Sequence, residues 1–248
     1  APAFPSDLTE DEVCAFVYTS GTTGSPKGAM LTHRNLVRNV EQFTQMVIFK
    51  PEDKILCVLP MFHCYGLTTV IHAGLMYGST IVILRSKNPS EIINAIVEHS
   101  VTMAIMVPPM YNLLARRGEP SVMQTVHDFI SGGAPIPQPV AQAFYDRFHH
   151  PVREGYGLTE ASPVVSVLPS DRLKYLTVGP AIPGVEVKIM TDREGPYQPG
   201  TVGELLVRGD NVMKGYWHRE EETKKVLEPD GWLHTGDLAY MDEDRFIY

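Results

Sequence analysis

The chain has 248 residues, a formal net charge of −8 and 44% hydrophobic residues. This length is sufficient for a sizeable core, and the charge and apolar content are those of an ordinary soluble globular protein. The acidic balance and the lack of any Lys/Arg run argue against nucleic acid as a partner.

The three cysteines indicate the compartment. Cys14, Cys57 and Cys64 lie in apolar runs, without a C-x-x-C spacing. Unpaired cysteines of this kind are typical of a reducing environment, so we expect a cytoplasmic protein. The sequence contains no signal peptide and no apolar stretch long enough to span a bilayer, while peripheral membrane contact stays open.

The first predicted element is a buried strand, followed by a loop rich in glycine and hydroxyl groups. The strand is the apolar run Val13–Tyr18, and the loop reads Thr19-Ser-Gly-Thr-Thr-Gly-Ser-Pro-Lys27-Gly28. Such a loop can surround a polyphosphate with N–H and hydroxyl groups, while its glycines allow close approach and the lysine adds positive charge. The spacing differs from the P-loop, because Gly28 and not Ser or Thr follows Lys27. A surface turn is the alternative, but the lysine and the hydroxyl density favour phosphate binding. The residues assigned to it are Thr19, Ser20, Gly21, Thr22, Thr23, Gly24 and Lys27.

Residues 13–156 alternate strand-like and helix-like segments, which is the pattern of a parallel α/β sheet. Thr32 is the expected N-cap of a helix that runs to about Phe49. An apolar helix is expected from Cys64 to Tyr77, with Gly78 as its C-cap. The other strands of this part are expected at 55–59, 80–84, 102–107 and 127–130, and the other helices begin near Pro89, Pro108 and Pro137.

The pattern changes at about Val164. Short strands at 185–189 and 204–207 alternate with Pro/Gly turns, and only residues 219–226 have the pattern of a helix. We therefore predict an α/β fold in which a parallel α/β subdomain, residues 1–163, precedes a smaller antiparallel, β-rich and barrel-like subdomain, residues 164–248.

Two further small-residue turns follow strands of the first part, and ligands of open α/β sheets bind at such strand ends. A tyrosine between two glycines can stack on a nucleobase, although a core tyrosine is the alternative. After it, Thr159 and Glu160 supply a hydroxyl and a carboxylate, or else cap a helix. Mg²⁺ binds one or two carboxylates together with waters and phosphate oxygens, which suits Glu160. The turns are Gly132, Gly133 and Ala134, and Gly155, Tyr156 and Gly157.

Four segments, in this order, resemble the adenylate-forming (AMP-binding) superfamily, which contains acyl- and aryl-CoA synthetases, luciferases and peptide-synthetase adenylation domains. They are the loop at 18–28, Pro60-Met-Phe-His63-Cys-Tyr-Gly66, Glu154-Gly-Tyr156-Gly-Leu-Thr159-Glu160 and Gly231-Trp-Leu-His-Thr-Gly-Asp237-Leu. They are spread over nearly the whole chain, and their sequences are most similar to those of the long-chain fatty acyl-CoA ligases.

The resemblance implies a role for each motif. Tyr156 stacks on adenine, Asp237 accepts from the ribose hydroxyls, and Thr159 bonds the α-phosphate next to the metal carboxylate Glu160. His63 lies beside the acyl carboxylate and the phosphate. Through backbone groups, Gly132, Gly133 and Ala134 line the nucleotide and acyl pocket.

The implied activity is that of an acid–thiol ligase. A carboxylic acid reacts with ATP and Mg²⁺ to give acyl-AMP and pyrophosphate, and CoA then displaces AMP. Amino-acid adenylation domains of this superfamily carry an aspartate after the matching Phe, which pairs with the α-ammonium. Here His63 follows Phe62 and nearby segments are apolar, so the resemblance implies a fatty acid as the substrate. The alternatives are a nucleotide- and acyl-binding fragment without useful turnover, or an aryl-CoA ligase or luciferase-like enzyme.

Both ends of the sequence have the pattern of a cut chain, since it begins without Met and stops within a strand-like run. We expect a fragment of the large N-terminal domain. By resemblance, a first N-terminal subdomain and a C-terminal lid domain, with its catalytic lysine, lie outside it. Lys27 is not that lysine.

Overall fold

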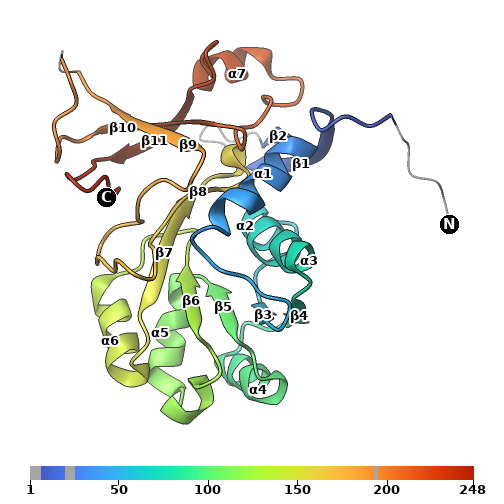
Figure 1. The fold of residues 1–248 in the computed structure, drawn as a ribbon, viewed down its shortest axis with the longest axis vertical. Helices are drawn as coiled ribbons and strands as arrows, with labels where there is room; N and C mark the ends of the chain where they lie inside the picture. The colour runs from blue at the N-terminus through green and yellow to red at the C-terminus, as the bar shows by residue number, and fades with distance from the viewer. Residues whose placement is uncertain (1–6, 20–25, 193–194) are drawn as a thin grey trace.

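The computed structural model describes residues 7–19, 26–192 and 195–248. A six-stranded sheet with its helices fills the lower part of Figure 1, and a three-stranded sheet with a short helix lies above it. The predicted α/β class, with a parallel sheet followed by an antiparallel one, is confirmed. No helix in the described ranges has both the length and the apolar character needed to cross a bilayer.

The large sheet has the strand order β4-β3-β5-β6-β7-β8, and only β8 runs antiparallel to its neighbour. Both faces of its central strands are covered, which explains why β3 and β5 are almost continuously hydrophobic. On one face Leu56, Ala104 and Phe129 pack against α4, α5 and α6; on the other Ile55 and Ile105 pack against α1, η1 and α3. The elements are β3 (Lys54–Cys57), β4 (Thr80–Ile83), β5 (Met103–Met106), β6 (Asp128–Ser131), β7 (Val152–Gly157), β8 (Val164–Val167), α1 (His33–Phe43), α4 (Pro89–His99), η1 (Leu67–His72), α3 (Ala73–Tyr77), α5 (Pro108–Arg117), η2 (Pro120–Met123) and α6 (Gln138–Phe148).

The helix boundaries follow the capping signals in the sequence. The Thr32 hydroxyl accepts a hydrogen bond from the Asn35 amide, and the Asn35 side chain accepts one from the Thr32 amide. α1 ends at Phe43, earlier than predicted, and the Thr44 hydroxyl donates back to the carbonyl of Val40. The predicted helix from Cys64 to Tyr77 is formed by α2 (Cys64–Gly66), the π-helical η1 and α3, and it ends at Gly78 with a φ of +69°.

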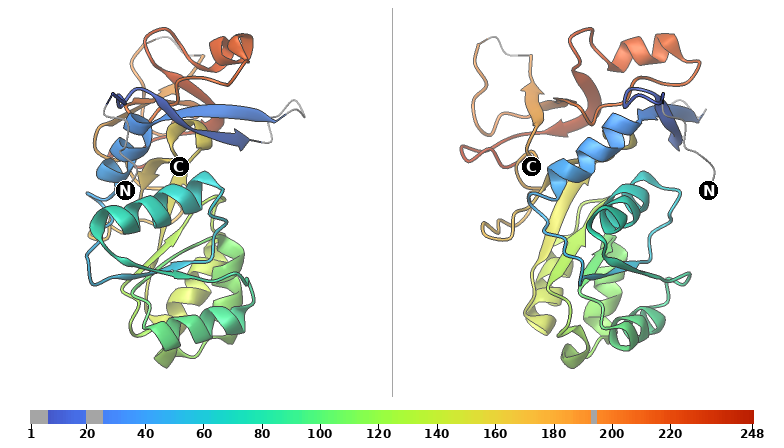
Figure 2. Two further views of the ribbon diagram at one scale, coloured as in Figure 1. Left: turned by 90° about the vertical axis from the view of Figure 1, so that its right-hand side faces the viewer. Right: turned by 45° about the vertical axis from the view of Figure 1, so that its right-hand side comes forward.

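The first strand is neither buried nor part of the parallel sheet, and both predictions for it are wrong. β1 (Val13–Thr19) pairs antiparallel with β2 (Lys27–Thr32), so the two form a separate hairpin. Within β1 only Val17 is buried, while Phe16 and Tyr18 are exposed. A two-stranded hairpin covers a single face, so an apolar run in it does not require burial on both sides. Figure 2 shows the hairpin at the junction of the two sheets.

The smaller sheet has the strand order β11-β10-β9 and is antiparallel. Residues 164–167, which the sequence placed in the second subdomain, form β8 and pair with β7 at the edge of the large sheet. The elements of the smaller region are β9 (Val185–Met190), β10 (Gly203–Gly209), α7 (Glu220–Val226) and β11 (Leu233–Ala239).

Candidate functional site

A cavity of about 320 Å³ lies at the carboxyl ends of β5, β6 and β7. Its apolar walls come from α1 and from the strands, and include Phe43, Ile105 and Ile130. The structure brings predicted site residues from three separate motifs to this cavity. They are His63, Gly132, Gly133, Gly155, Tyr156, Gly157, Thr159 and Glu160.

A second cavity, of about 460 Å³, lies on the other side of Tyr156 and reaches the smaller sheet. Ala134 and Asp237 line it, and it shares Tyr156 and its flanking glycines with the first cavity. The Tyr156 hydroxyl donates a 2.6 Å hydrogen bond to Asp237 Oδ2. Burial, and to a smaller extent Asp237, raise the pKa of Tyr156, so its hydroxyl stays a donor. The arrangement is two compartments that meet at one tyrosine.

Asp237 lies on an irregular stretch of β11. The residue before it, Gly236, has a φ of +76°, and the pairing of β10 with β11 shifts register at this point. The Asp237 amide donates to the Thr235 hydroxyl, and the Gly236 amide donates to Glu204 Oε1. These bonds leave the exposed Asp237 side chain directed at the second cavity, where Tyr156 meets it.

Thr159 and Glu160 begin the short helix η3 (Thr159–Ala161), directly after β7. The buried Thr159 hydroxyl lies 3.2 Å from Cys64 Sγ. Glu160 Oε1 accepts a 2.6 Å hydrogen bond from the hydroxyl of Tyr216. Tyr216 was not among the site residues predicted from the sequence. Its one local signal is the preceding Gly215, which has a φ of +140° and no room for a Cβ beside Thr223.

His63 is exposed at the mouth of the first cavity and caps α2, with Nδ1 accepting from the Tyr65 amide at 3.1 Å. Cys64 Sγ lies 3.7 Å from this nitrogen. Burial raises the pKa of the Cys64 thiol, which disfavours the thiolate that a nucleophile requires. His63 is therefore available to a ligand through its other ring nitrogen and not as part of a Cys/His pair.

The predicted phosphate loop is described only at its two ends. Thr19 and Lys27 form the last pair of the β1–β2 hairpin. The Lys27 ammonium lies 5.2 Å from the centre of the Tyr216 ring, within the range of a cation–π contact. Ser20, Gly21, Thr22, Thr23 and Gly24 lie outside the described residues. The hairpin thus brings Lys27 to the residue that also contacts Glu160.

Metal binding at this site would rest on a single carboxylate. In the part of the chain that the structure describes, no group of three or more His, Cys, Asp or Glu side chains is placed to hold a metal ion. Mg²⁺ in nucleotide sites takes one or two carboxylates and completes its shell with waters and phosphate oxygens. Glu160, at the cavity and on the side of Lys27, fits that pattern and does not fit a metal cage made by protein alone.

Comparisons with known proteins agree on one family. A sequence profile described as "AMP-binding enzyme" matches residues 1–217. The chain is similar to 4-coumarate–CoA ligase 3 of Oryza sativa subsp. japonica, with 37% identity over 98% of this chain and 46% of that protein. It is also similar to feruloyl-CoA synthase of Amycolatopsis sp, with 36% identity over 100% of this chain and 50% of that protein.

Solved structures give the same result. Apo MatB from Rhodopseudomonas palustris matches with a TM-score of 0.91 and 31% identity, over 98% of this chain and 48% of that one. O-succinylbenzoate coenzyme A synthetase (MenE) from Bacillus subtilis, in complex with ATP and magnesium ion, matches with a TM-score of 0.88 and 31% identity, over 97% and 50%. The chain spans about half the length of the relatives it matches.

Proposed function

The chain belongs to the AMP-binding enzyme family, and on that premise we propose that the whole protein is an ATP-dependent ligase that joins an aromatic carboxylic acid to CoA. In the first step a carboxylate oxygen attacks the α-phosphorus of ATP, and pyrophosphate leaves. In the second step the CoA thiol attacks the acyl carbon, loses its proton, and AMP leaves. The acid, ATP, Mg²⁺ and CoA are therefore the ligands of the whole protein.

The observation that carries the proposal is the position of Tyr156 between two cavities. The nucleoside would occupy the cavity of about 460 Å³, with adenine on the Tyr156 ring and the ribose at Asp237. The acid would occupy the apolar cavity of about 320 Å³. The two cavities share Gly157, which directly precedes the Leu158–Thr159 turn, so carboxylate and α-phosphate would meet there.

The polar residues around this meeting point supply charge and hydrogen bonds. Thr159 and His63 line the acid cavity and would bond the reacting oxygens. Glu160 would hold Mg²⁺, which when bound neutralises phosphate charge and orients the pyrophosphate that leaves. Lys27 would add a second positive charge on the phosphate side. Positioning and charge neutralisation of this kind carry most of the catalysis in phosphoryl chemistry.

The comparisons support an aromatic acid over the fatty acid expected from the sequence. The two relatives compared by sequence are named for 4-coumarate and ferulate, both aromatic acids, and not for fatty acids. Within the cavity, the Tyr65 ring lies against Gly132, where a Cβ would come within 2.9 Å of it. A ring seated on a glycine makes a flat apolar wall, which suits a planar substrate.

The cavity also argues against a second carboxylate on the substrate, such as the one in the O-succinylbenzoate of the MenE relative. Among the described residues, its lining contains neither Lys nor Arg. A buried carboxylate without a cation to pair with is strongly disfavoured. The substrate that fits is therefore an aromatic acid whose tail is uncharged.

A cytoplasmic location is part of the proposal. It rests on Cys14, Cys57 and Cys64, all three of which are free thiols.

The decisive experiment compares binding of non-hydrolysable acyl-sulfamoyl-adenosine analogues to this chain by calorimetry. The acyl groups are 4-coumaroyl, feruloyl, hexadecanoyl and O-succinylbenzoyl. We expect the two hydroxycinnamoyl analogues to bind at least about 10-fold more tightly than the others, a difference of 1.4 kcal/mol. Tighter binding of the hexadecanoyl analogue would overturn the aromatic assignment, and equal binding of adenosine alone would remove the acid cavity from the site.

A further inference from the structure

The segment of residues 213–217 ties together parts of the site that are far apart in sequence. The Met213 amide donates to the carbonyl of Glu160 at 2.8 Å. Farther along, Met30 of β2 donates to the carbonyl of Gly215, and the Trp217 amide donates to the carbonyl of Gly28, each at 2.8 Å. The segment therefore holds η3 at one end and the β2 side of the phosphate-loop hairpin along the rest.

Tyr216 lies in this segment, and its side chain contacts two candidate site residues. Its hydroxyl donates to Glu160 Oε1 at 2.6 Å, and the Lys27 ammonium lies 5.2 Å from its ring centre. The Tyr216 side chain is buried, and its backbone amide donates to the Thr223 hydroxyl of α7 at 2.9 Å. One rigid ring therefore separates the candidate metal carboxylate from the candidate phosphate lysine.

Packing alone does not account for this arrangement. Tyr216 belongs to a core cluster with Val17, Leu31 and Met213, which a phenylalanine would fill equally well. Among the described residues, the hydroxyl bonds only to Glu160, and a bond from a neutral donor to a carboxylate is stronger than one to a neutral acceptor. Burial, followed by the hydrogen bond to Glu160, raises the pKa of Tyr216, so its hydroxyl stays a donor.

We propose that Tyr216 is a positioning residue that fixes the Glu160 carboxylate relative to Lys27, so that Mg²⁺ and the nucleotide phosphates meet charges that are already in place. This inference rests on the proposed function. Tyr216 itself would touch neither the metal nor the nucleotide. By occupying Oε1 of Glu160, its hydroxyl selects one orientation of the carboxylate and directs the remaining lone pairs to the ion. Preorganised groups of this kind do not have to reorient when charge develops.

The test is Tyr216→Phe in the whole protein, assayed by ATP–pyrophosphate exchange over a range of Mg²⁺ concentrations. We expect the Mg²⁺ concentration for half-maximal rate to rise on the order of 10-fold, the loss that corresponds to one hydrogen bond to a charged group. The KM for the carboxylic acid should not change, because Tyr216 does not line the acid cavity.

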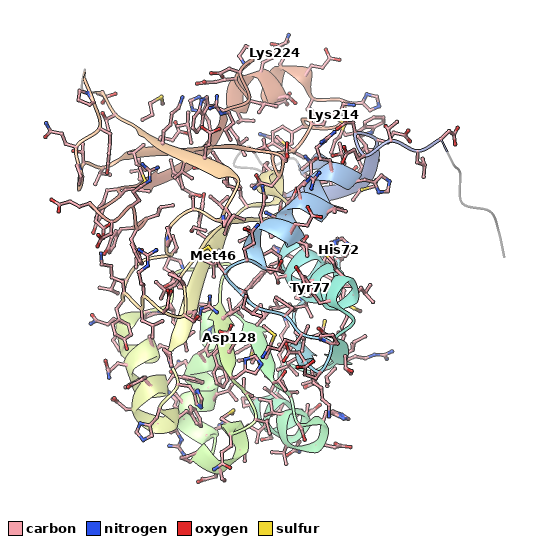
Figure 3. The ribbon with its side chains drawn as sticks, in the orientation of Figure 1. Met46, His72, Tyr77, Asp128, Lys214 and Lys224 are labelled. Atoms are coloured by element: carbon pink, nitrogen blue, oxygen red, sulfur yellow. The ribbon has the colours of Figure 1, made fainter. Side chains whose placement is uncertain are left out.

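Tyr77→Phe is the matched control. It also removes a partly buried tyrosine hydroxyl, which lies 2.8 Å from the Thr44 hydroxyl. Figure 3 shows Tyr77 on α3, well below Lys214, which is two residues before Tyr216. The same shift in Mg²⁺ dependence in both variants, or none in Tyr216→Phe, would overturn the proposal.

Two further variants keep the test decisive. Glu160→Gln separates this inference from the proposed function: unchanged Mg²⁺ dependence there removes Glu160 from the metal site altogether. If Glu160→Gln responds and Tyr216→Phe does not, only the positioning role fails. Should Tyr216→Phe not fold, Thr223→Val removes the acceptor of the Tyr216 amide and leaves the phenol in place. A smaller shift of the same sign is expected there, and no shift counts against the proposal.

Discussion

Tyr156 and Asp237 are 81 residues apart in the chain, on different sheets, and their side chains share a 2.6 Å hydrogen bond. Tyr156 lies on β7, where this strand pairs with the antiparallel edge strand β8, and Asp237 lies on the irregular stretch of β11. The bond therefore fixes the smaller sheet against the larger one at the point where the two cavities meet. A nucleoside in the second cavity would contact both residues.

Tyr156→Phe should weaken ATP binding by roughly 2- to 10-fold, since it removes one hydrogen bond of about 0.5–1.5 kcal/mol. The ring that would stack on adenine remains. Tyr156→Ala removes the ring as well and should weaken binding further, by about 1 kcal/mol or more. Calorimetry of ATP with each variant gives the two values. Equal affinities in the Phe and Ala variants would mean that adenine does not stack on this ring.

Glu160→Gln should lower the rate of adenylate formation on the order of 10²-fold, because one preorganised charge is lost from the reaction site. The folded state should persist, since Glu160 is only half-buried at the cavity. Pyrophosphate release in the whole protein measures the rate, and circular dichroism checks the fold. Glu220→Gln, on the exposed start of α7, is the control for removal of a carboxylate elsewhere. Wild-type rates in both variants would exclude Glu160 from catalysis.

Gly132→Ala should weaken binding of the acid and leave binding of the nucleotide unchanged. An added Cβ would lie 2.9 Å from Cζ and 3.0 Å from Oη of Tyr65, so this ring would have to move. Tyr65 is held by a 3.2 Å hydrogen bond to the carbonyl of Met106, which makes the movement costly. Overpacking of this kind typically costs about 1–3 kcal/mol. We expect the KM for the acid to rise by the factor that corresponds to this energy, while the ATP affinity stays unchanged. A fall in ATP affinity alone would show that Gly132 belongs to the nucleotide compartment.

The sequence predicts the large sheet and its helices well, because local signals determine them. Thr32, Gly78 and the prolines at helix starts act within one turn. The prediction for β1 is wrong because an apolar run indicates a strand but not the strand with which it pairs.

The site is predicted in part, for a similar reason. The motif residues are recognisable because each lies in a distinctive local pattern. Tyr216 was missed because its partner Glu160 is 56 residues away. The substrate class depends on cavity walls from several elements, such as Phe43 and Tyr65, and no single stretch of sequence contains them.

His234 connects the ribose motif to two carboxylates. Its Nδ1 lies 3.0 Å from Glu204 Oε2, and its Nε2 lies 2.9 Å from Glu228 Oε1. Both ring nitrogens can donate only in the protonated imidazole. Lys188 also belongs to this cluster, with its ammonium 3.9 Å from Glu228 Oε2. The bond to Glu204, followed by that to Glu228, raises the pKa of His234 above its ordinary 6.5.

The stability that His234 contributes should depend on pH with a definite sign. Because its pKa is higher in the folded than in the unfolded state, the contribution is complete below pH 6.5 and is lost as pH rises through the folded-state pKa. Glu204 also accepts a hydrogen bond from the Gly236 amide, next to Asp237. Loss of the His234–Glu204 bond should therefore also disturb Asp237, which would bind the ribose. We therefore expect both the midpoint of thermal unfolding and the ATP affinity to fall as pH rises above 6.5. His234→Gln should flatten both profiles, while His99→Gln, at an exposed position on α4, should leave them unchanged. Parallel profiles for His234→Gln and wild type would show that the two carboxylates hold a neutral ring, and that the pH dependence arises elsewhere.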